Sequence, residues 1–311
     1  MKTAFIFPGQ GSQTVGMGKY FFDNFAEAKN VFLEVDDALN QKLSHIIFEG
    51  PLEDLTFTEN TQPALMACSI AILKVIEKLS GKDISKLCQF VAGHSLGEFT
   101  ALAATNAFDI LTTAKLLKLR GQAMQESVPK GEGAMFALLG ANLDIAQDIA
   151  KQITSQGGLC EVANDNSQQQ QVLSGNIQGI DLAIELATQK GFKAIKLKVS
   201  APFHSSLMKP AQKKLATALD KIQVLEPSVP IIANVNAQPE QKPQIKDNLI
   251  KQTTSTVLWR ESMQKLKELG VTKFFEIGPG NVCTNLCKRI DKDSSAIALN
   301  NIYSIHYCTK N

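Results

Sequence analysis

The chain has 311 residues, 44% of them hydrophobic, and its formal net charge at pH 7 is only +2. A chain of this length can bury a large core in one domain or two, and a charge so close to zero gives no general affinity for nucleic acid. No apolar run approaches the ~18 residues that a membrane helix needs, and the apolar run before Pro8 is too short for a signal peptide. We therefore expect a cytoplasmic protein that does not enter a membrane.

Strand-like and helix-like segments alternate along most of the chain. Strands are predicted at 3–7, 89–92, 230–233 and 273–277, and helices at 62–79, 96–104, 110–125 and 258–269. This alternation is typical of a mostly parallel sheet covered by helices.

Between residues 128 and 198 the spacing of the elements changes. Strands at 134–139, 159–163, 171–174 and 193–199 are predicted to enclose helices at 143–154 and 180–190. The order β-α-β-β-α-β is that of the ferredoxin-like split unit. The four glutamines at 168–171 are interpreted as a solvated loop.

The segment GHSLGE at 93–98 is the first candidate for chemistry. A buried strand is predicted before it and a helix after it, which is the setting of a nucleophile elbow with Ser95 at the turn. The glycines at 93 and 97 permit a tight turn, and the Leu96 amide becomes a candidate oxyanion donor. Taken alone, the same pattern also fits an ordinary glycine-rich turn.

A serine nucleophile needs a base, and the chain has four histidines. His94 adjoins Ser95 in the backbone and should point away from it, His45 lies in an apolar stretch, and His306 lies near the end of the chain. His204 remains, in a loop between a predicted strand and a helix that starts near residue 207.

The six cysteines contain no Cys-x-x-Cys pair, so neither a metal site nor a disulfide framework is expected.

Five motifs together resemble a known family. They are FIFPGQGSQ at 5–13, GHSLGE at 93–98, RGQAMQ at 120–125, PFHS at 202–205 and EIGPG at 276–280. They occur in the order seen in acyl-carrier-protein S-malonyltransferases, the bacterial malonyl-CoA:acyl-carrier-protein transacylases of type II fatty acid synthesis. The resemblance runs from about residue 3 to about residue 300.

The resemblance implies a fold of two parts. An α/β-hydrolase-like core with a parallel sheet would comprise residues 1–127 and 199–311. A ferredoxin-like subdomain at 128–198 would be inserted into it, with the active site in the cleft between them.

The resemblance also implies a Ser-His dyad of Ser95 and His204, whose imidazole is oriented by a main-chain carbonyl near Gln252. The serine would take the malonyl group from malonyl-CoA and pass it to the phosphopantetheine thiol of holo acyl carrier protein. The amides of Leu96 and Gln10 would hold the oxyanion. No metal and no cofactor is implied, since the coenzyme A thioester is itself the substrate.

Substrate choice is assigned to further residues by the same resemblance. Arg120 would pair with the malonyl carboxylate, although its sequence setting also fits a solvated basic helix face. Gln252 is counted among the substrate-binding residues, Phe203 resembles the residue of malonyl-selective members, and Asn164 lies in a segment that carries asparagines near the cleft in relatives.

The acidic helices expected of the carrier protein need a basic surface. Two groups of lysines flank His204 in the sequence and could form this surface: Lys193, Lys196 and Lys198 before it, and Lys209, Lys213 and Lys214 after it. The alternative interpretation is that both groups are only solvent-exposed faces with no partner.

Two other functions stay open on the sequence: an acyltransferase with a different acyl preference, and a hydrolase of the esterase class. In simple α/β-hydrolases the histidine lies near the end of the chain, whereas about a hundred residues, including two strand-like runs, follow His204 here. The hydrolase is therefore the weaker interpretation.

Overall fold

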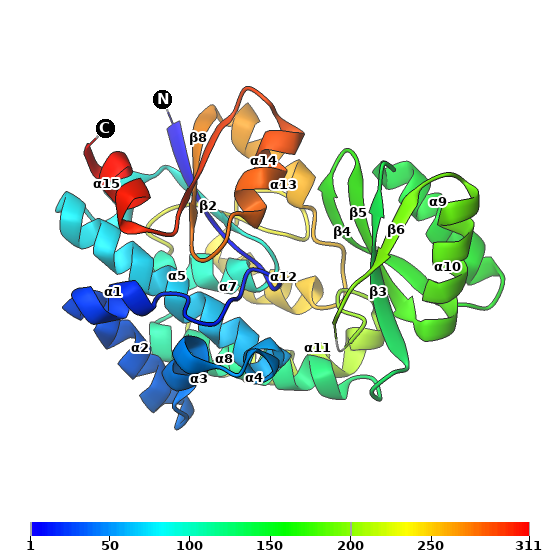
Figure 1. Ribbon diagram of the computed structural model, residues 1–311, viewed down its shortest axis with the longest axis horizontal. Helices are drawn as coiled ribbons and strands as arrows, with labels where there is room; N and C mark the ends of the chain where they lie inside the picture. The colour runs from blue at the N-terminus through cyan, green and yellow to red at the C-terminus, as the bar shows by residue number, and fades with distance from the viewer. Residues whose placement is uncertain (1, 200, 311) are drawn as a thin grey trace.

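The computed structural model describes residues 2–199 and 201–310. Residues 1, 200 and 311, which the predicted core includes, lie outside the described residues. The larger part of the structure is built on a five-stranded sheet (Figure 1). Its strands, in the spatial order β7-β2-β1-β8-β9, are β7 (Ile231–Ile232), β2 (Phe90–Gly93), β1 (Lys2–Phe7), β8 (Val271–Ile277) and β9 (Ser295–Leu299). All four neighbouring pairs are parallel.

Both faces of this sheet are buried, which explains why its central strand β1 is apolar from Ala4 to Phe7. Along β1, Phe5 and Phe7 face one hydrophobic cluster while Ala4 and Ile6 face another, as the two-residue period of a strand requires. The second cluster contains Trp259, whose side chain is fully buried.

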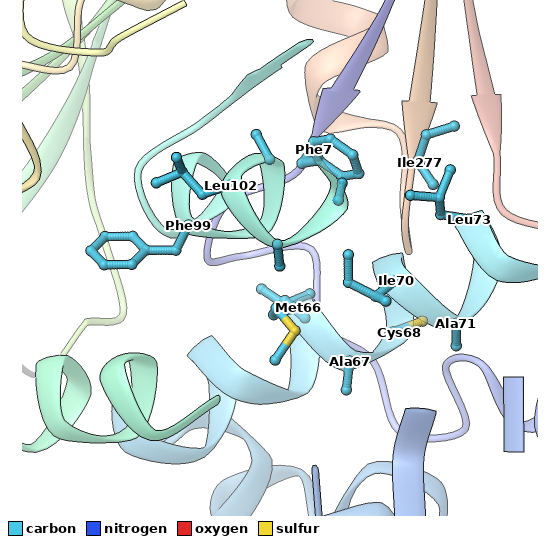
Figure 2. Packing of buried hydrophobic residues seen from close by; sticks show 14 of the residues in the cluster. Phe7, Met66, Ala67, Cys68, Ile70, Ala71, Leu73, Phe99, Leu102 and Ile277 are labelled. Carbon is cyan, nitrogen blue, oxygen red and sulfur yellow. The ribbon is translucent and has the colours of Figure 1, made fainter. Parts of the chain in front are cut away.

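The first cluster is filled largely by α5 (Thr58–Ser80), a long helix that lies under the sheet. Figure 2 shows its side chains Met66, Ile70 and Leu73 together with Phe7 of β1 and Ile277 of β8. Near them lies α7 (Leu96–Ala104), the helix that follows β2. The nucleophile segment thus packs against a long helix that is itself largely buried.

The remaining helices of this part surround the sheet. They are α1 (Lys19–Asn24), α2 (Ala26–Leu39), α3 (Leu43–Glu49), α4 (Leu52–Thr56), α6 (Ile84–Leu87), α8 (Ile110–Glu126), α11 (Lys209–Asp220), α12 (Ile245–Gln252), α13 (Trp259–Glu268), α14 (Val282–Ile290) and α15 (Ile302–Lys310), with short 3-10 turns η1 (Ser206–Met208) and η2 (Lys242–Gln244).

The smaller part is a four-stranded antiparallel sheet, drawn in green at the right of Figure 1. Its strands are β4 (Cys160–Ser167), β5 (Gln170–Asn176), β3 (Gly133–Leu139) and β6 (Lys193–Lys196), in that spatial order. Helices α9 (Leu143–Ser155) and α10 (Ile177–Gln189) cover one face through their own hydrophobic cluster. The chain order β-α-β-β-α-β and the parallel core sheet confirm the predicted fold class.

The opposite face of the small sheet packs on the larger part. Met135 and Val172 of this face share a cluster with Met124 of α8 and Phe203. We propose that the domain boundaries lie near residues 127 and 199, where the chain passes between the two sheets.

Three sequence expectations are wrong. The glutamine run is not simply a solvated loop, because Gln171 is a buried residue of β5 and donates a hydrogen bond from Nε2 to the Ser167 carbonyl. The chain end, beyond the resemblance that runs to about residue 300, forms α15, with Ile305 buried against the first cluster. A third strand, β9, follows His204 where two strands were expected, and β6 ends at Lys196, which leaves Lys198 beyond the strand.

Within the described ranges, none of the helices combines the length and the apolar character needed to cross a bilayer.

Candidate active site

Ser95 occupies a sharp turn between β2 and α7. Its backbone has φ 54° and ψ −108°, a region that non-glycine residues seldom adopt. The turn is possible because two glycines leave no side chain in the way: a Cβ on Gly93 would lie 1.8 Å from the Gly97 carbonyl oxygen, and one on Gly97 would lie 2.5 Å from the Phe7 oxygen. The predicted elbow therefore has the required backbone.

The structure brings Ser95 and His204 together across 109 residues of sequence. Ser95 Oγ lies 2.7 Å from His204 Nε2, and His204 Nδ1 lies 2.8 Å from the main-chain oxygen of Gln252. A carbonyl oxygen only accepts, so Nδ1 carries the proton and Nε2 is free to accept one from the serine. This is the arrangement of a nucleophile with its general base.

His204 is buried, and burial lowers the pKa of its imidazole to about 3, with the positive charge of Arg120 acting in the same direction. The imidazole is therefore neutral at physiological pH, which is the form that can take a proton from Ser95.

Arg120 projects from α8 to the nucleophile. Its Nη2 donates to Ser95 Oγ at 3.1 Å and to Gln252 Oε1 at 2.9 Å, and its Nη1 donates to Gln62 Oε1 at 2.7 Å. Burial lowers the pKa of the guanidinium to about 10, so it keeps its charge at neutral pH. A fixed cation beside the serine can pair with a group that carries a negative charge.

Ser95, His204 and Arg120 line one cavity of about 280 Å³ between the two sheets. Gln10, Leu96, Asn164 and Phe203, the other residues predicted from the family resemblance, line the same cavity together with Met124, Met135, Leu197 and Lys198. Leu96 is the first residue of α7, so its amide has no acceptor within the helix and remains available to an oxyanion. Gln252 reaches the site through Arg120 and His204.

The other three histidines are not part of the dyad, although His94 also lines the cavity. His94 Nε2 pairs with Asn166 Oδ1 at 2.8 Å, and its ring packs on Trp259. His45 on α3 and His306 on α15 are exposed.

Gln62, Glu98 and Asn234 also belong to the site, and their roles were not predicted from the sequence. Asn234 Oδ1 accepts from the Ser95 amide at 2.8 Å, and its Nδ2 donates to the Gly93 carbonyl at 2.7 Å. A polar residue two positions after the core strand Ile231–Ile232 was a usable signal, because the carboxyl ends of parallel strands carry the functional groups of α/β proteins. The sequence offers no comparable signal for Gln62.

Among residues 2–199 and 201–310, no three histidine, cysteine, aspartate or glutamate side chains lie where they could hold a metal ion together. All six cysteines are free thiols.

The chain matches the acyl transferase domain family over residues 4–301. It is 46% identical over 300 residues to the malonyl CoA-acyl carrier protein transacylase of Bacillus subtilis (strain 168), a match that covers 96% of this chain and 93% of that protein.

Solved structures with the same architecture include two transferases. The acyl-carrier-protein-S-malonyltransferase of Bartonella henselae has a TM-score of 0.97 and 47% identity, covering 100% of this chain and 99% of the other. A malonyl-transacylase in complex with its type II PKS acyl-carrier protein has a TM-score of 0.96 and 37% identity, with 100% of both chains covered.

Proposed function

Because the chain belongs to the acyl transferase family and matches its malonyl CoA-acyl carrier protein transacylases along almost its whole length, we propose that it transfers malonyl groups. The donor is malonyl-CoA and the acceptor is the phosphopantetheine thiol of acyl carrier protein. The product supplies extender units for fatty acid synthesis. The observation that carries the proposal is the contact of Ser95 Oγ with both His204 and Arg120.

In the first half-reaction the Ser95 oxygen attacks the thioester carbonyl of malonyl-CoA. Its proton moves to His204 Nε2, and the Gln252 carbonyl stabilises the imidazolium that forms. The oxyanion is held by the amides of Leu96 and Gln10. When the carbon–sulfur bond breaks, the proton passes to the coenzyme A sulfur and malonyl-Ser95 remains.

In the second half-reaction the carrier thiol enters the same cavity. His204 takes the thiol proton, the sulfur attacks the ester carbonyl, and the proton returns to Ser95 Oγ as the ester bond breaks. Since the first product leaves before the second substrate reacts, the kinetics are of the ping-pong type.

Arg120 selects the acyl group in this scheme. Its guanidinium contacts the atom that becomes the ester oxygen, so a malonyl carboxylate bound next to Ser95 lies beside a buried positive charge. An acetyl group offers that charge no anionic partner, and the guanidinium keeps only its neutral acceptors Gln62 and Gln252.

We further propose that the reaction uses no cofactor, because the acyl group moves between two thiols through the serine alone. We also place the enzyme in the cytoplasm. Six unpaired cysteines fit a reducing compartment.

The test is the intact mass of the protein after mixing with malonyl-CoA, with and without holo carrier protein. We expect one malonyl group on Ser95 that disappears when the carrier is added, and none on Ser95→Ala. Acylation of a cysteine, or of the alanine variant, would refute the assignment.

A further inference from the structure

Glu98 is a buried carboxylate that the mechanism above does not use. It lies in the first turn of α7, three residues after the nucleophile, and its side chain has no solvent exposure. Its Oε2 accepts hydrogen bonds from Gln252 Nε2 at 2.7 Å and from the Asn234 amide at 3.1 Å. A carboxylate buried so deeply is costly unless its surroundings compensate it, so its position calls for a reason.

The first contact fixes which way the Gln252 amide faces. Gln252 Nε2 meets only acceptors, the Glu98 carboxylate and the Ser95 carbonyl oxygen at 2.9 Å, together with a longer contact of 3.3 Å to Asn234 Oδ1. Gln252 Oε1 therefore faces Arg120 Nη2. A reversed amide would place its oxygen against the carboxylate and its nitrogen against the guanidinium, so it is excluded by repulsion at both ends.

The second contact reaches the elbow. Glu98 holds the main chain of Asn234, and the Asn234 side chain in turn holds the Ser95 amide and the Gly93 carbonyl. Glu98 thus contacts both Asn234, which holds the nucleophile, and Gln252, which holds Arg120.

We propose that Glu98 is a positioning residue for malonyl transfer: by accepting from Gln252 and Asn234, it holds the Arg120 guanidinium and the Ser95 elbow in register with each other. The inference rests on the proposed function, since it concerns the orientation of the group that would bind the malonyl carboxylate. Glu98 itself is not among the residues that line the cavity.

The charges around Glu98 allow its acceptor role to be separated from its charge. Burial raises the pKa of Glu98 to about 7, while the Gln252 and Asn234 donors and the positive charge of Arg120 lower it. Glu240 is the other carboxylate that acts on this region, and its own pKa is raised by burial and by Glu98. Oε2 can therefore accept hydrogen bonds whether or not the Glu98 carboxyl group is ionised. A glutamine at position 98 can present an acceptor oxygen at the same place.

The experiment compares Glu98→Met, which removes the acceptor, with Glu98→Gln, which keeps one. Glu240→Met is the matched control, because Glu240 is also a buried carboxylate but accepts from Asn248 and does not contact Gln252. For each protein, the rates of Ser95 acylation by malonyl-CoA and acetyl-CoA and the melting temperature are measured.

For Glu98→Met we expect the malonyl rate to fall about 10²-fold, the loss typical of a misplaced reacting group, and the malonyl-to-acetyl ratio to fall with it. Glu98→Gln should recover both to within a factor of about ten, and Glu240→Met should keep the wild-type ratio. A Glu98→Met protein with a lower melting temperature but an unchanged ratio would overturn the inference, as would a Glu98→Gln protein as impaired as Glu98→Met. If the wild-type protein did not malonylate Ser95, the proposed function would fail instead, so the two failures are distinguishable.

Discussion

The main-chain oxygen of Gln252 lies 2.8 Å from His204 Nδ1, in the place that a carboxylate occupies in a Ser-His-Asp triad. The side chain of the same residue accepts from Arg120. One residue thus supports the base through its backbone and the substrate-binding cation through its side chain, and mutation can separate the two supports.

Gln252→Ala is expected to keep the contact with His204, because every residue has a carbonyl, but to remove the acceptor of Arg120. A lost hydrogen bond to a charged group costs about 1.5–3 kcal/mol, so the malonyl-CoA rate should fall roughly 10–150-fold. The rate with acetyl-CoA should change much less. Steady-state kinetics with both substrates measure this, and equal losses would show that the alanine disturbs His204 as well.

Arg120 is expected to determine the choice between acyl groups directly. Arg120→Ala should cost malonyl transfer about 2–5 kcal/mol, as for truncation of one partner of a buried charge pair, while acetyl transfer is little affected or improves. Arg120→Lys should fall between the two, because an ammonium lacks the planar fork that reaches Gln62, Gln252 and Ser95 together. If alanine lowered both rates equally, Arg120 would serve the fold and not selection.

The pKa of His204 predicts a pH dependence of stability. Its value falls from 6.5 in the unfolded chain to about 3 in the folded protein, so the unfolded chain binds the proton first as the pH drops. The stability contributed by neutral His204 is therefore fully present above pH 6.5 and is lost progressively as the pH falls toward 3.

Urea denaturation of the wild type and of His204→Gln between pH 7.5 and 4 measures this contribution as the difference between the two free energies of unfolding. Glu98, whose pKa is raised on folding, acts in the opposite direction and increases stability toward acid. Because both proteins contain Glu98, its effect cancels in the difference. We expect the wild type to lose stability faster toward acid than the variant. Parallel curves would show that the His204 imidazole is not kept neutral by burial.

Much of this site could be predicted because its parts are local in sequence. The helix predicted at 96–104 is found with the same bounds, and the elbow is encoded by Gly93, Ser95 and Gly97, which are neighbours in the chain. The family resemblance pointed to Arg120, and the structure brings it to Ser95 across 25 residues.

What was missed depends on contacts between distant segments. Glu98 stood in the quoted motif, but its role appears only when Gln252, 154 residues away, packs against it. Strand β9 has few cues because three of its five residues, at the edge of the sheet, are not buried. Helix α15 is stabilised by burial of Ile305 against the first cluster, and the local sequence pattern does not predict that contact.

The backbone of the elbow can be tested by adding a methyl group. Gly93→Ala places a Cβ 1.8 Å from a backbone oxygen that cannot move without unwinding α7, so we expect a loss of about 3 kcal/mol or more in unfolding free energy. Gly157→Ala is the control: nothing lies within 4 Å of its added Cβ, and only its φ of 86° is unfavourable, at about 1–2 kcal/mol. Similar melting temperatures for the two variants would contradict the tight turn.

The last prediction concerns how the two substrates reach the cavity. Lys198 lines the cavity with an exposed side chain, whereas Lys196 and Lys214 are already paired with Asp181 and Glu126 at 2.8 Å and 2.6 Å. Malonyl-CoA and holo carrier protein carry the same phosphopantetheine arm with its phosphate, so a cation at the cavity should act on both.

We therefore expect Lys198→Glu to raise the KM for malonyl-CoA and for carrier protein. The double reversal of Lys213 and Lys214 to glutamate on α11 should raise only the KM for the carrier, whose acidic helices extend beyond the arm. Because such steering acts mainly on association, both effects should shrink when the Debye length falls from about 10 Å at 0.1 M salt to about 3 Å at 1 M. Lys29→Glu on α2, outside the cavity lining, is the charge-matched control. If the carrier kinetics were unchanged by the double reversal and independent of salt, the docking surface would lie elsewhere. If Lys198→Glu raised only the KM for the carrier, Lys198 would not act on the phosphate that both substrates share.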